Sequence, residues 1–476
     1  MIDNLSYFSP QLILASLVLV LMIQTSIRRS ETAAQMICLT GLFLAIAATL
    51  HFTPSTRLLV TELVVIQPLS QFLNFLILLS ALSSVLLQTR YSTRSREVQD
   101  EFYMLISLAT LGACILTTAN HGATLVLGLE LMSLSILAMI GYQRQRHLAL
   151  EASLKFLILS GSASAFLLFG MALLYAGTGS LLLPELMQVS QNAPNLLLLT
   201  QIGMVMVIIG LGFKLSLIPF HWWTPDVYQG APVNSTLFLA TVSKTAVFGV
   251  LLHLLLLVSG PVTESLIAVL SGVAIISMLG GNLLALQQAN LKRLFAYSAI
   301  AHMGYVLVAA ILGIQVNNSM ALEGSSYYLL AYVLASIAIF SVLTMLSNIT
   351  KDSDFEQIDE VRGLFWTHPW LATTLLFATL SMAGMPLTVG FIGKFYLLAM
   401  AVEHSAWWLI SAMIVGSVIG LYYYLRVIFS LFAQSEQVLP NSSVITRTWV
   451  GFIALGILIL GVLPGTLGGH IAALFT

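Results

Sequence analysis

The sequence predicts an all-α integral membrane protein with about fourteen transmembrane helices. Hydrophobic residues make up 58% of the 476 residues and charged residues only 8%, whereas soluble domains carry about 25% charged residues. Long unbroken apolar runs recur along the chain, and they are long enough for helices that need ~20 residues to cross a bilayer. The alternating pattern of a membrane barrel is absent, which excludes that class.

The apolar runs define the predicted spans, and turn or charged residues separate them. The run at 368–400 is too long for one straight helix, and Gly384 and Pro386 interrupt it. The predicted spans are residues 10–27, 34–52, 67–88, 102–119, 122–142, 152–175, 199–222, 233–257, 264–286, 292–313, 326–349, 368–400, 406–432 and 448–470.

Basic residues in the loops predict the orientation of the chain. If the N-terminus lies outside, the outside loops contain only Arg57, and all other loop Lys and Arg residues lie inside. This asymmetry follows the positive-inside rule, and an even number of spans then places both termini outside. The inside set is Arg28, Arg29, Arg90, Arg94, Arg96, Arg144, Arg146, Lys292, Arg293, Lys351, Arg362 and Arg447.

Two sets of five spans have opposite predicted orientations. In each set the fourth span contains prolines and a lysine: Pro219 and Pro225 near Lys214, and Pro386 near Lys394. Matched broken helices in two inverted halves indicate a transport fold built from inverted repeats. The predicted organisation is three N-terminal helices (1–101), a first repeat (102–257), a second repeat (264–432) and a last helix (448–470).

Charged residues within the predicted spans point to function. Glu130 is the only acidic residue well inside a span. A charge at the bilayer centre costs roughly 2.5–3.5 kcal/mol, so Glu130, Lys214, Lys244 and Lys394 together would cost about 10–14 kcal/mol. This sum predicts paired charges and water-filled cavities. Arg426, near the inside end of its span, is expected to snorkel to the surface.

Three lysines are candidate proton carriers. Burial destabilises the charged form of a lysine, whereas a neighbouring carboxylate stabilises it. If the carboxylate moves or changes its charge, the lysine can therefore gain or lose a proton. Lys214 has no acidic neighbour at helical spacing, which leaves Glu130 as its candidate partner. Lys244 lies in mid-span among hydroxyl residues. The structural alternatives are a Glu130–Lys214 tether and a Lys244 satisfied by carbonyls of the broken helix.

Lys155 and His302 have two interpretations each. Lys155 follows Glu151 by one helical turn near the predicted inner surface, so it either forms a local surface pair or belongs to a proton path. His302 shares a helical face with Ser298 and Tyr305. It either relays protons or forms a hydrogen bond between helices.

Four sequence motifs resemble those of a known family. Residues 212–232 read Gly-Phe-Lys-Leu-Ser-Leu-Ile-Pro-Phe-His-Trp-Trp-Thr-Pro-Asp-Val-Tyr-Gln-Gly-Ala-Pro, and residues 385–395 read Met-Pro-Leu-Thr-Val-Gly-Phe-Ile-Gly-Lys-Phe. With Ser-Lys-Thr at 243–245 and Ala-His-Met-Gly-Tyr at 301–305, they resemble the proton-pumping antiporter-like subunits of respiratory complex I. The resemblance extends over nearly the whole chain.

This resemblance implies a role in proton translocation for six residues. They are Glu130 and Lys214 as a modulating ion pair, Lys244 as the central carrier, His302 as the bridge between two half-channels, Lys394 as the far-side carrier and Lys155 on the uptake route.

Within that family, the sequence is most similar to the subunit called N. Lys394 occupies a position where subunit M carries glutamate, and the chain lacks the long lateral helix of subunit L after the last span. The resemblance then implies a translocase subunit of NADH-quinone oxidoreductase in a bacterial inner membrane, with periplasmic termini. It implies that NADH, FMN, iron–sulfur clusters and quinone bind to other subunits and not to this chain. The implied partners are subunit M, small subunits J and K, and the lipid bilayer; a net charge of −1 offers no surface for nucleic acid.

Three alternatives remain open at the level of sequence. A free-standing or Mrp-type cation/proton antiporter would use similar lysines. An inert scaffold between subunits would gain nothing from buried charges. A quinone-binding redox subunit has no supporting motif in the sequence.

Overall fold

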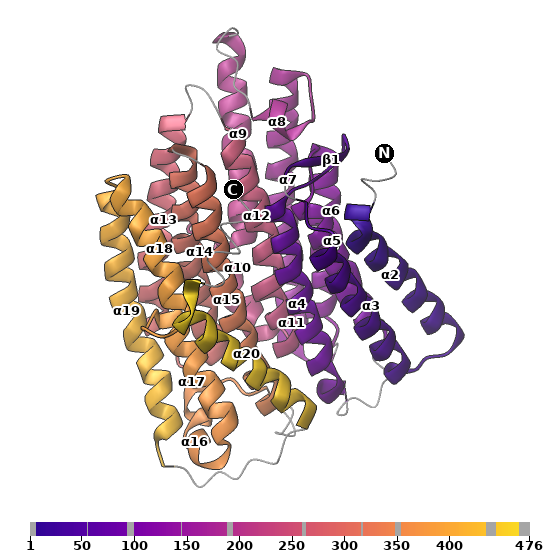
Figure 1. Cartoon of the computed structure of the whole chain (residues 1–476), viewed down its shortest axis with the longest axis vertical. Helices are drawn as coiled ribbons and strands as arrows, with labels where there is room; N and C mark the ends of the chain where they lie inside the picture. The colour runs from indigo at the N-terminus through magenta and orange to yellow at the C-terminus, as the bar shows by residue number, and fades with distance from the viewer. Residues whose placement is uncertain are drawn as a thin grey trace.

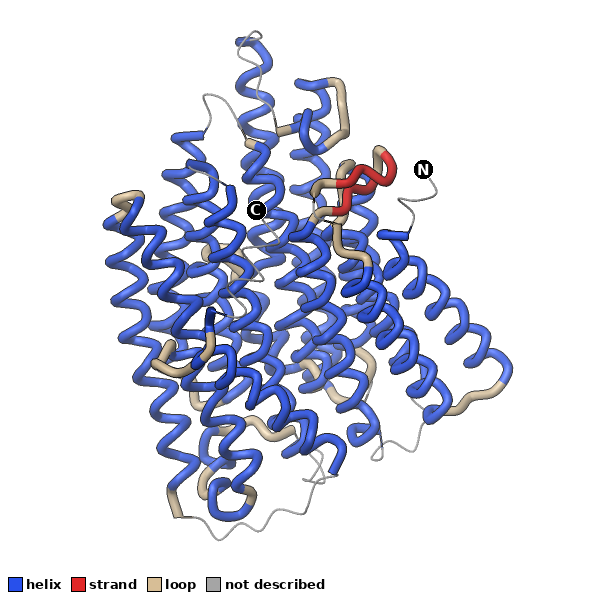
Figure 2. Tube along the Cα trace, in the orientation of Figure 1, coloured by secondary structure: helices blue, strands red, loops and turns tan. Residues whose placement is uncertain are grey.

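The protein is a bundle of helices, most of which run along the longest axis of the molecule (Figures 1 and 2). The computed structural model describes residues 6–54, 56–92, 100–143, 145–187, 194–258, 263–315, 318–347, 354–434 and 444–465. Within these ranges twelve helices are long and apolar enough to cross a membrane, and Pro369–Ala383 and Thr446–Val462 are shorter apolar helices. The predicted all-α membrane class is therefore confirmed. Four of the predicted inside-loop charges lie outside the described residues: Arg94, Arg96, Arg144 and Lys351.

The N-terminal part contains three long helices and a small hairpin. Ser30 begins the second long helix, because its hydroxyl accepts a hydrogen bond from the Ala33 amide. Arg29 forms ion pairs with Asp100 and Glu101, the first two residues of the helix Asp100–Thr117. The elements are η1 (Ser6–Phe8), α2 (Ser9–Ile27), α3 (Glu31–His51), the antiparallel strands β1 (Leu58–Thr61) and β2 (Val64–Ile66), and α4 (Pro68–Ser92). The end of the molecule that carries β1 and β2 is called the hairpin end below.

The middle of the chain contains the first broken helix. The chain leaves helical geometry after Leu215 and resumes it at Trp223. The elements are α5 (Asp100–Thr117), α6 (Gly122–Ile140), α7 (His147–Thr178), α8 (Leu183–Leu186), α9 (Pro194–Leu215), α10 (Trp223–Gly230), α11 (Val233–Phe238), a π-helical turn η2 (Leu239–Ser243) and α12 (Lys244–Leu257).

The C-terminal part contains the second broken helix, between Ala383 and Val389, where Gly384 and Pro386 were expected to interrupt it. Gly384 ends the first half in the left-handed conformation that glycine adopts without steric cost (φ +82°). The elements are α13 (Thr263–Leu286), α14 (Leu291–Gln315), α15 (Asn318–Ser347), η3 (Ile358–Val361), α16 (Leu364–Thr367), α17 (Pro369–Ala383), α18 (Val389–Glu403), α19 (Trp407–Phe432) and α20 (Val444–Val462).

The expected role of Pro225 in the first break is wrong. Pro219 lies in the non-helical stretch 216–222, but Pro225 lies in the first turn of α10. An amide at that position has no intrahelical partner, so a proline without an N–H is tolerated there. The first break therefore depends on the segment around Pro219.

Burial separates central helices from peripheral ones. The apolar windows of α14 and α15 are completely buried, whereas the window of α7 is 33% buried. Figure 1 shows α14 and α15 in the middle of the bundle. Large apolar side chains such as Leu127 and Val418 are exposed, as expected for surfaces that face lipid or a neighbouring subunit. The central helices α14 and α15 are therefore enclosed by other helices of the bundle, whereas α7 lies at its periphery.

Candidate functional site

Lys244 binds the open end of the first broken helix. Its ammonium group donates to the Leu215 carbonyl at 3.0 Å and to the Ser216 hydroxyl at 2.9 Å, and its side chain is buried. Leu215 is the last residue of α9, so its carbonyl has no partner within the helix. The Ser216 hydroxyl also accepts from Thr224 at 2.6 Å. The carbonyl contact is the one that the structural alternative for Lys244 anticipated.

Lys214, on the last turn of α9, is held by two serines. Its ammonium group donates to Ser133 on α6 at 2.8 Å and to Ser160 on α7 at 2.5 Å. The Glu130 carboxylate, one turn before Ser133, accepts from Ser164 at 2.5 Å. Hydroxyl groups from α6 and α7 therefore stand next to both the acid and the lysine.

The expected direct ion pair between Glu130 and Lys214 is not formed. Both residues are described, and no hydrogen bond or ion pair joins them; each instead bonds to serines. Two neutral hydroxyls satisfy the ammonium group in the bundle interior, while Glu130 lies half-buried toward the outer face of α6. The two charged groups are therefore bonded to different serines: Lys214 to Ser133 and Ser160, and Glu130 to Ser164.

Lys155 joins α7 to the second half of the first broken helix. It pairs with Glu151 at 2.8 Å, the local pair that one of its two interpretations expected, and also with Asp226 of α10 at 2.8 Å. Asp226 pairs in addition with Arg293 of α14 at 2.8 Å. This half-exposed cluster connects three helices at the end of the bundle opposite the hairpin end.

Lys394 binds the open end of the second broken helix. Its ammonium group donates to the carbonyl of Ala383, the last residue of α17, at 2.9 Å. It also lies 5.1 Å from the centroid of the Tyr305 ring, a favourable position for a cation over an aromatic face. The ion pairs of the described residues include neither Lys394 nor Lys244. Both lysines are therefore buried next to carbonyls without an acidic partner.

His302 lies at the centre of a hydroxyl cluster. Its Nδ1 contacts the Tyr328 hydroxyl at 2.6 Å, and its Nε2 contacts the Tyr424 hydroxyl at 3.1 Å. Tyr424 also forms a short hydrogen bond with Ser298. A small cavity is lined by His302, Tyr328 and Lys394 together. The structure thus brings the predicted residues His302 and Lys394 into one site.

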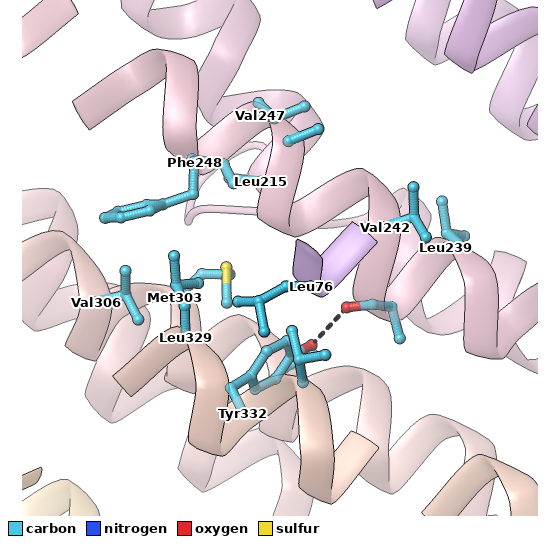
Figure 3. Packing of buried hydrophobic residues seen from close by; sticks show 14 of the residues in the cluster. Leu76, Leu215, Leu239, Val242, Val247, Phe248, Met303, Val306, Leu329 and Tyr332 are labelled. Atoms are coloured by element: carbon cyan, nitrogen blue, oxygen red, sulfur yellow. Dashed lines mark hydrogen bonds between the residues drawn. The ribbon is translucent and has the colours of Figure 1, made fainter. Parts of the chain in front are cut away.

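Tyr332 lies between the two broken-helix sites. Its hydroxyl donates to the Ala240 carbonyl in the π-helical turn η2 at 3.1 Å, as the dashed line in Figure 3 shows, and its ring lies 5.6 Å from that of His302. Apolar side chains, including Leu215 and Met303, fill the surrounding space (Figure 3). Tyr332 is therefore the polar side chain that connects the helix of Lys244 with the helix pair around His302.

Two comparisons identify the family. The family model described as NADH:quinone oxidoreductase/Mrp antiporter, TM, matches residues 119–420, more than half of the chain. A chain in the structure of respiratory complex I from Thermus thermophilus with bound aureothin is 34% identical, with a TM-score of 0.84 over 98% of this chain and 99% of that one. The protein belongs to the NADH:quinone oxidoreductase/Mrp antiporter family of membrane subunits. The resemblance inferred from the motifs is confirmed at this level.

More distant members of the same fold come from other assemblies. A chain of the membrane-bound sulfane sulfur reductase, an archaeal respiratory membrane complex, is 21% identical, with a TM-score of 0.87 over 98% of this chain and 96% of that one. A chain of the Mrp complex from Dietzia sp. DQ12-45-1b is 17% identical, with a TM-score of 0.86 over 99% of this chain and 97% of that one. These similarities show a shared fold for the antiporter-like subunits.

Several polar residues around the site of His302 and Lys394 were not predicted from the sequence. Tyr328 and Tyr424 hold His302, and Asn282 connects the hydroxyls of Tyr305 and Tyr423 at 3.2 and 3.0 Å. The one local signal was a run of three tyrosines, 422–424, within an apolar span. The sequence does not show which of the three tyrosines face the interior. In the structure Tyr422 is exposed and the other two are buried.

Proposed function

We propose that this chain is subunit N of a proton-pumping NADH-quinone oxidoreductase and carries protons across a bacterial inner membrane. The proposal is carried by one observation: Lys244 and Lys394 each donate to the terminal carbonyl of a broken helix, without an acidic partner among the described residues. A permanently charged amine is costly at this depth. An amine that gains and loses a proton is charged, and therefore unfavourable in the membrane, only while it is protonated.

The contacts support an order of proton-carrying groups. Lys155 and Asp226 lie at the predicted inner surface, where protons would be taken up. Lys214 would be modulated by Glu130 across the serines, and Lys244 would be the central carrier beside Ser216. Tyr332 and His302 would bridge to Lys394 on the far side. This order rests on proposed inverted repeats at 102–257 and 264–432, each with one broken helix.

The exposed faces support assembly with other membrane subunits. Glu130 is half-buried beside Leu127 and Leu134, which are 68% and 56% exposed on the same face of α6. A carboxylate at this depth requires a protein or water neighbour instead of lipid. We assign this face to a neighbouring subunit, subunit M or one of the small subunits J and K. NADH, FMN, iron–sulfur clusters and quinone would bind elsewhere in the complex, and both termini would be periplasmic.

Purification of the tagged chain from native membranes tests this function. The expected result is an assembly that oxidises NADH with quinone and pumps protons into closed vesicles. Replacing the chain with its Lys214→Ala variant should preserve assembly and reduce pumping strongly. An assembly that exchanges Na⁺ for H⁺ without NADH oxidation would instead support the Mrp-type antiporter.

A further inference from the structure

Lys292, in the first turn of α14, is a third lysine that binds the end of a half-helix. Its side chain is completely buried, and its ammonium group donates to the Ala231 carbonyl at 2.9 Å. Ala231 directly follows α10, the second half of the first broken helix. Lys244 and Lys394 bind the first halves, α9 and α17. Lys292 therefore binds a part of the first broken helix that the other two lysines do not contact.

Lys292 also differs from those two lysines in having acidic partners. Carboxylate oxygens of Asp354 and Glu356 each lie 3.2 Å from its nitrogen. Together with the Ala231 carbonyl, they provide three acceptors for the three N–H groups of the ammonium. A buried charge is tolerated where it is paired and fully hydrogen-bonded. The surroundings of Lys292 therefore suit a permanent positive charge, unlike those of Lys244, which has no acidic partner among the described residues.

The next residue of α14, Arg293, binds the same half-helix. Its guanidinium group donates to Asp226 at 2.8 Å and to Gln229 at 3.0 Å, and both of these residues belong to α10. Because α10 has only eight residues, it is too short to be stable without contacts to neighbouring helices. A cation at the C-terminal end of a helix also stabilises it through the helix dipole. Lys292 and Arg293 therefore hold the C-terminal half of α10 against α14.

Asp354 links this contact to the segment that leads to the second broken helix. It lies in the connector 354–357, which is followed by η3, α16 and then α17, the first half of the second broken helix. The connector is bonded to the start of α14, since the Leu291 amide donates to the Glu356 carbonyl at 2.5 Å. The Asp354 carboxylate also pairs with Arg146, just ahead of α7, at 2.8 Å. Lys292 therefore lies where α10 meets this connector.

We propose that Lys292 is a positioning residue of the proton pump, a permanently charged anchor that fixes α10 to the connector leading to the second broken helix. It carries no proton itself. It acts by holding α10 in the position where Asp226 meets Lys155, and loss of its ammonium group releases the end of that half-helix. The effect on pumping rests on the proposed function, whereas the anchoring of α10 can be measured independently of it.

Hydrogen–deuterium exchange of the intact complex, read by mass spectrometry, measures how firmly α10 is held. In Lys292→Met the backbone amides of α10 should exchange about tenfold faster, the factor expected for one lost hydrogen bond to a charged group. Arg426→Met is the matched control, because Arg426 donates to the carbonyl of Leu286 at the end of α13. It should speed exchange at that end and leave α10 unchanged. Unchanged exchange of α10 in Lys292→Met, or equally fast exchange in the control, would overturn the proposal.

Lys292→Arg distinguishes an anchor from a proton carrier. Arginine keeps the charge and the donors but does not release its proton at accessible pH. Proton pumping and exchange of α10 are measured in the same preparations, and the arginine variant carries the test alone if Lys292→Met does not assemble. For an anchor the two measurements change together: pumping is nearly normal where α10 is protected and falls where α10 exchanges faster.

Two results for Lys292→Arg would contradict the anchor. Loss of pumping with normal exchange of α10 would make Lys292 a proton carrier. Normal pumping with fast exchange of α10 would show that the position of this half-helix does not matter for the pump. Full pumping by Lys244→Ala would refute the proposed function itself, whereas exchange of α10 in the Lys292 variants would still decide whether Lys292 holds the half-helix.

Discussion

The Lys394 ammonium group donates a hydrogen bond of 2.9 Å to the carbonyl oxygen of Ala383. Ala383 ends α17 and Lys394 lies on α18, so this bond joins the two halves of one broken helix. Lys244, on the separate helix α12, likewise donates to a terminal carbonyl, that of Leu215 at the end of α9. Terminal carbonyls carry the partial negative charge of the helix dipole. They stabilise a loaded lysine without the permanent charge of a carboxylate.

Replacing Lys394 with glutamine separates hydrogen bonding from proton carriage. The glutamine amide can still donate to Ala383, but it does not gain or lose a proton. We expect Lys394→Gln to assemble normally and to slow proton pumping by about 100-fold, the lower range for loss of a positioned proton-transfer group. Pumping by purified complex in vesicles measures this effect. Normal pumping would assign Lys394 a purely structural role.

The tyrosines around His302 offer a matched comparison. Tyr328→Phe and Tyr424→Phe each remove one hydroxyl that contacts the His302 ring. Each should lower the pumping rate by roughly fivefold through one lost hydrogen bond. Tyr327→Phe is the control, because Tyr327 is next to Tyr328 on α15 but donates to Leu460 of α20. The rates of all three variants are compared at equal amounts of assembled complex. A decrease of the same size in the control would point to helix packing as the cause.

The serines between Glu130 and Lys214 should transmit the effect of the carboxylate. Removing both hydroxyl partners of the lysine with Ser133→Ala and Ser160→Ala leaves a buried ammonium group unsatisfied, which is costly. The double variant is expected to impair pumping nearly as much as Glu130→Gln. Ser135→Ala, on the same helix, should have no effect, since its hydroxyl donates to the Leu131 carbonyl. If the double variant pumps at the rate of Ser135→Ala, the serines do not connect the two charges.

Much of the fold follows from patterns that act within one helix. Apolar length predicts the spans, and charges inside apolar runs identify the lysines, because their cost in a membrane is high wherever they lie. The break at Gly384 was predictable because Gly384 and Pro386 interrupt the apolar run 368–400 in the sequence itself. Pro225 was misinterpreted because a proline in a first helical turn looks the same in sequence as one that breaks a helix.

The hydroxyl network could not be predicted from the sequence. Serine and tyrosine are common in membrane helices, and most serines there bond to their own helix, as Ser135 does. Ser160 and Tyr424 differ only because distant helices place Lys214 and His302 beside them. The missing contact between Glu130 and Lys214 has the same origin, since the serines that bind them come from two separate helices.

Substitution of Lys244 tests the central claim, that a buried lysine carries protons and does not merely provide a positive charge. Arginine preserves the charge and can still donate to Leu215, but it does not release its proton at accessible pH. The variants Lys244→Arg and Lys244→Ala are compared in vesicles that contain equal amounts of assembled complex, with NADH oxidation and proton uptake recorded together. We predict that pumping by Lys244→Arg falls about as far as pumping by Lys244→Ala. Near-normal pumping by the arginine variant would show that charge alone is sufficient and would contradict proton carriage by Lys244.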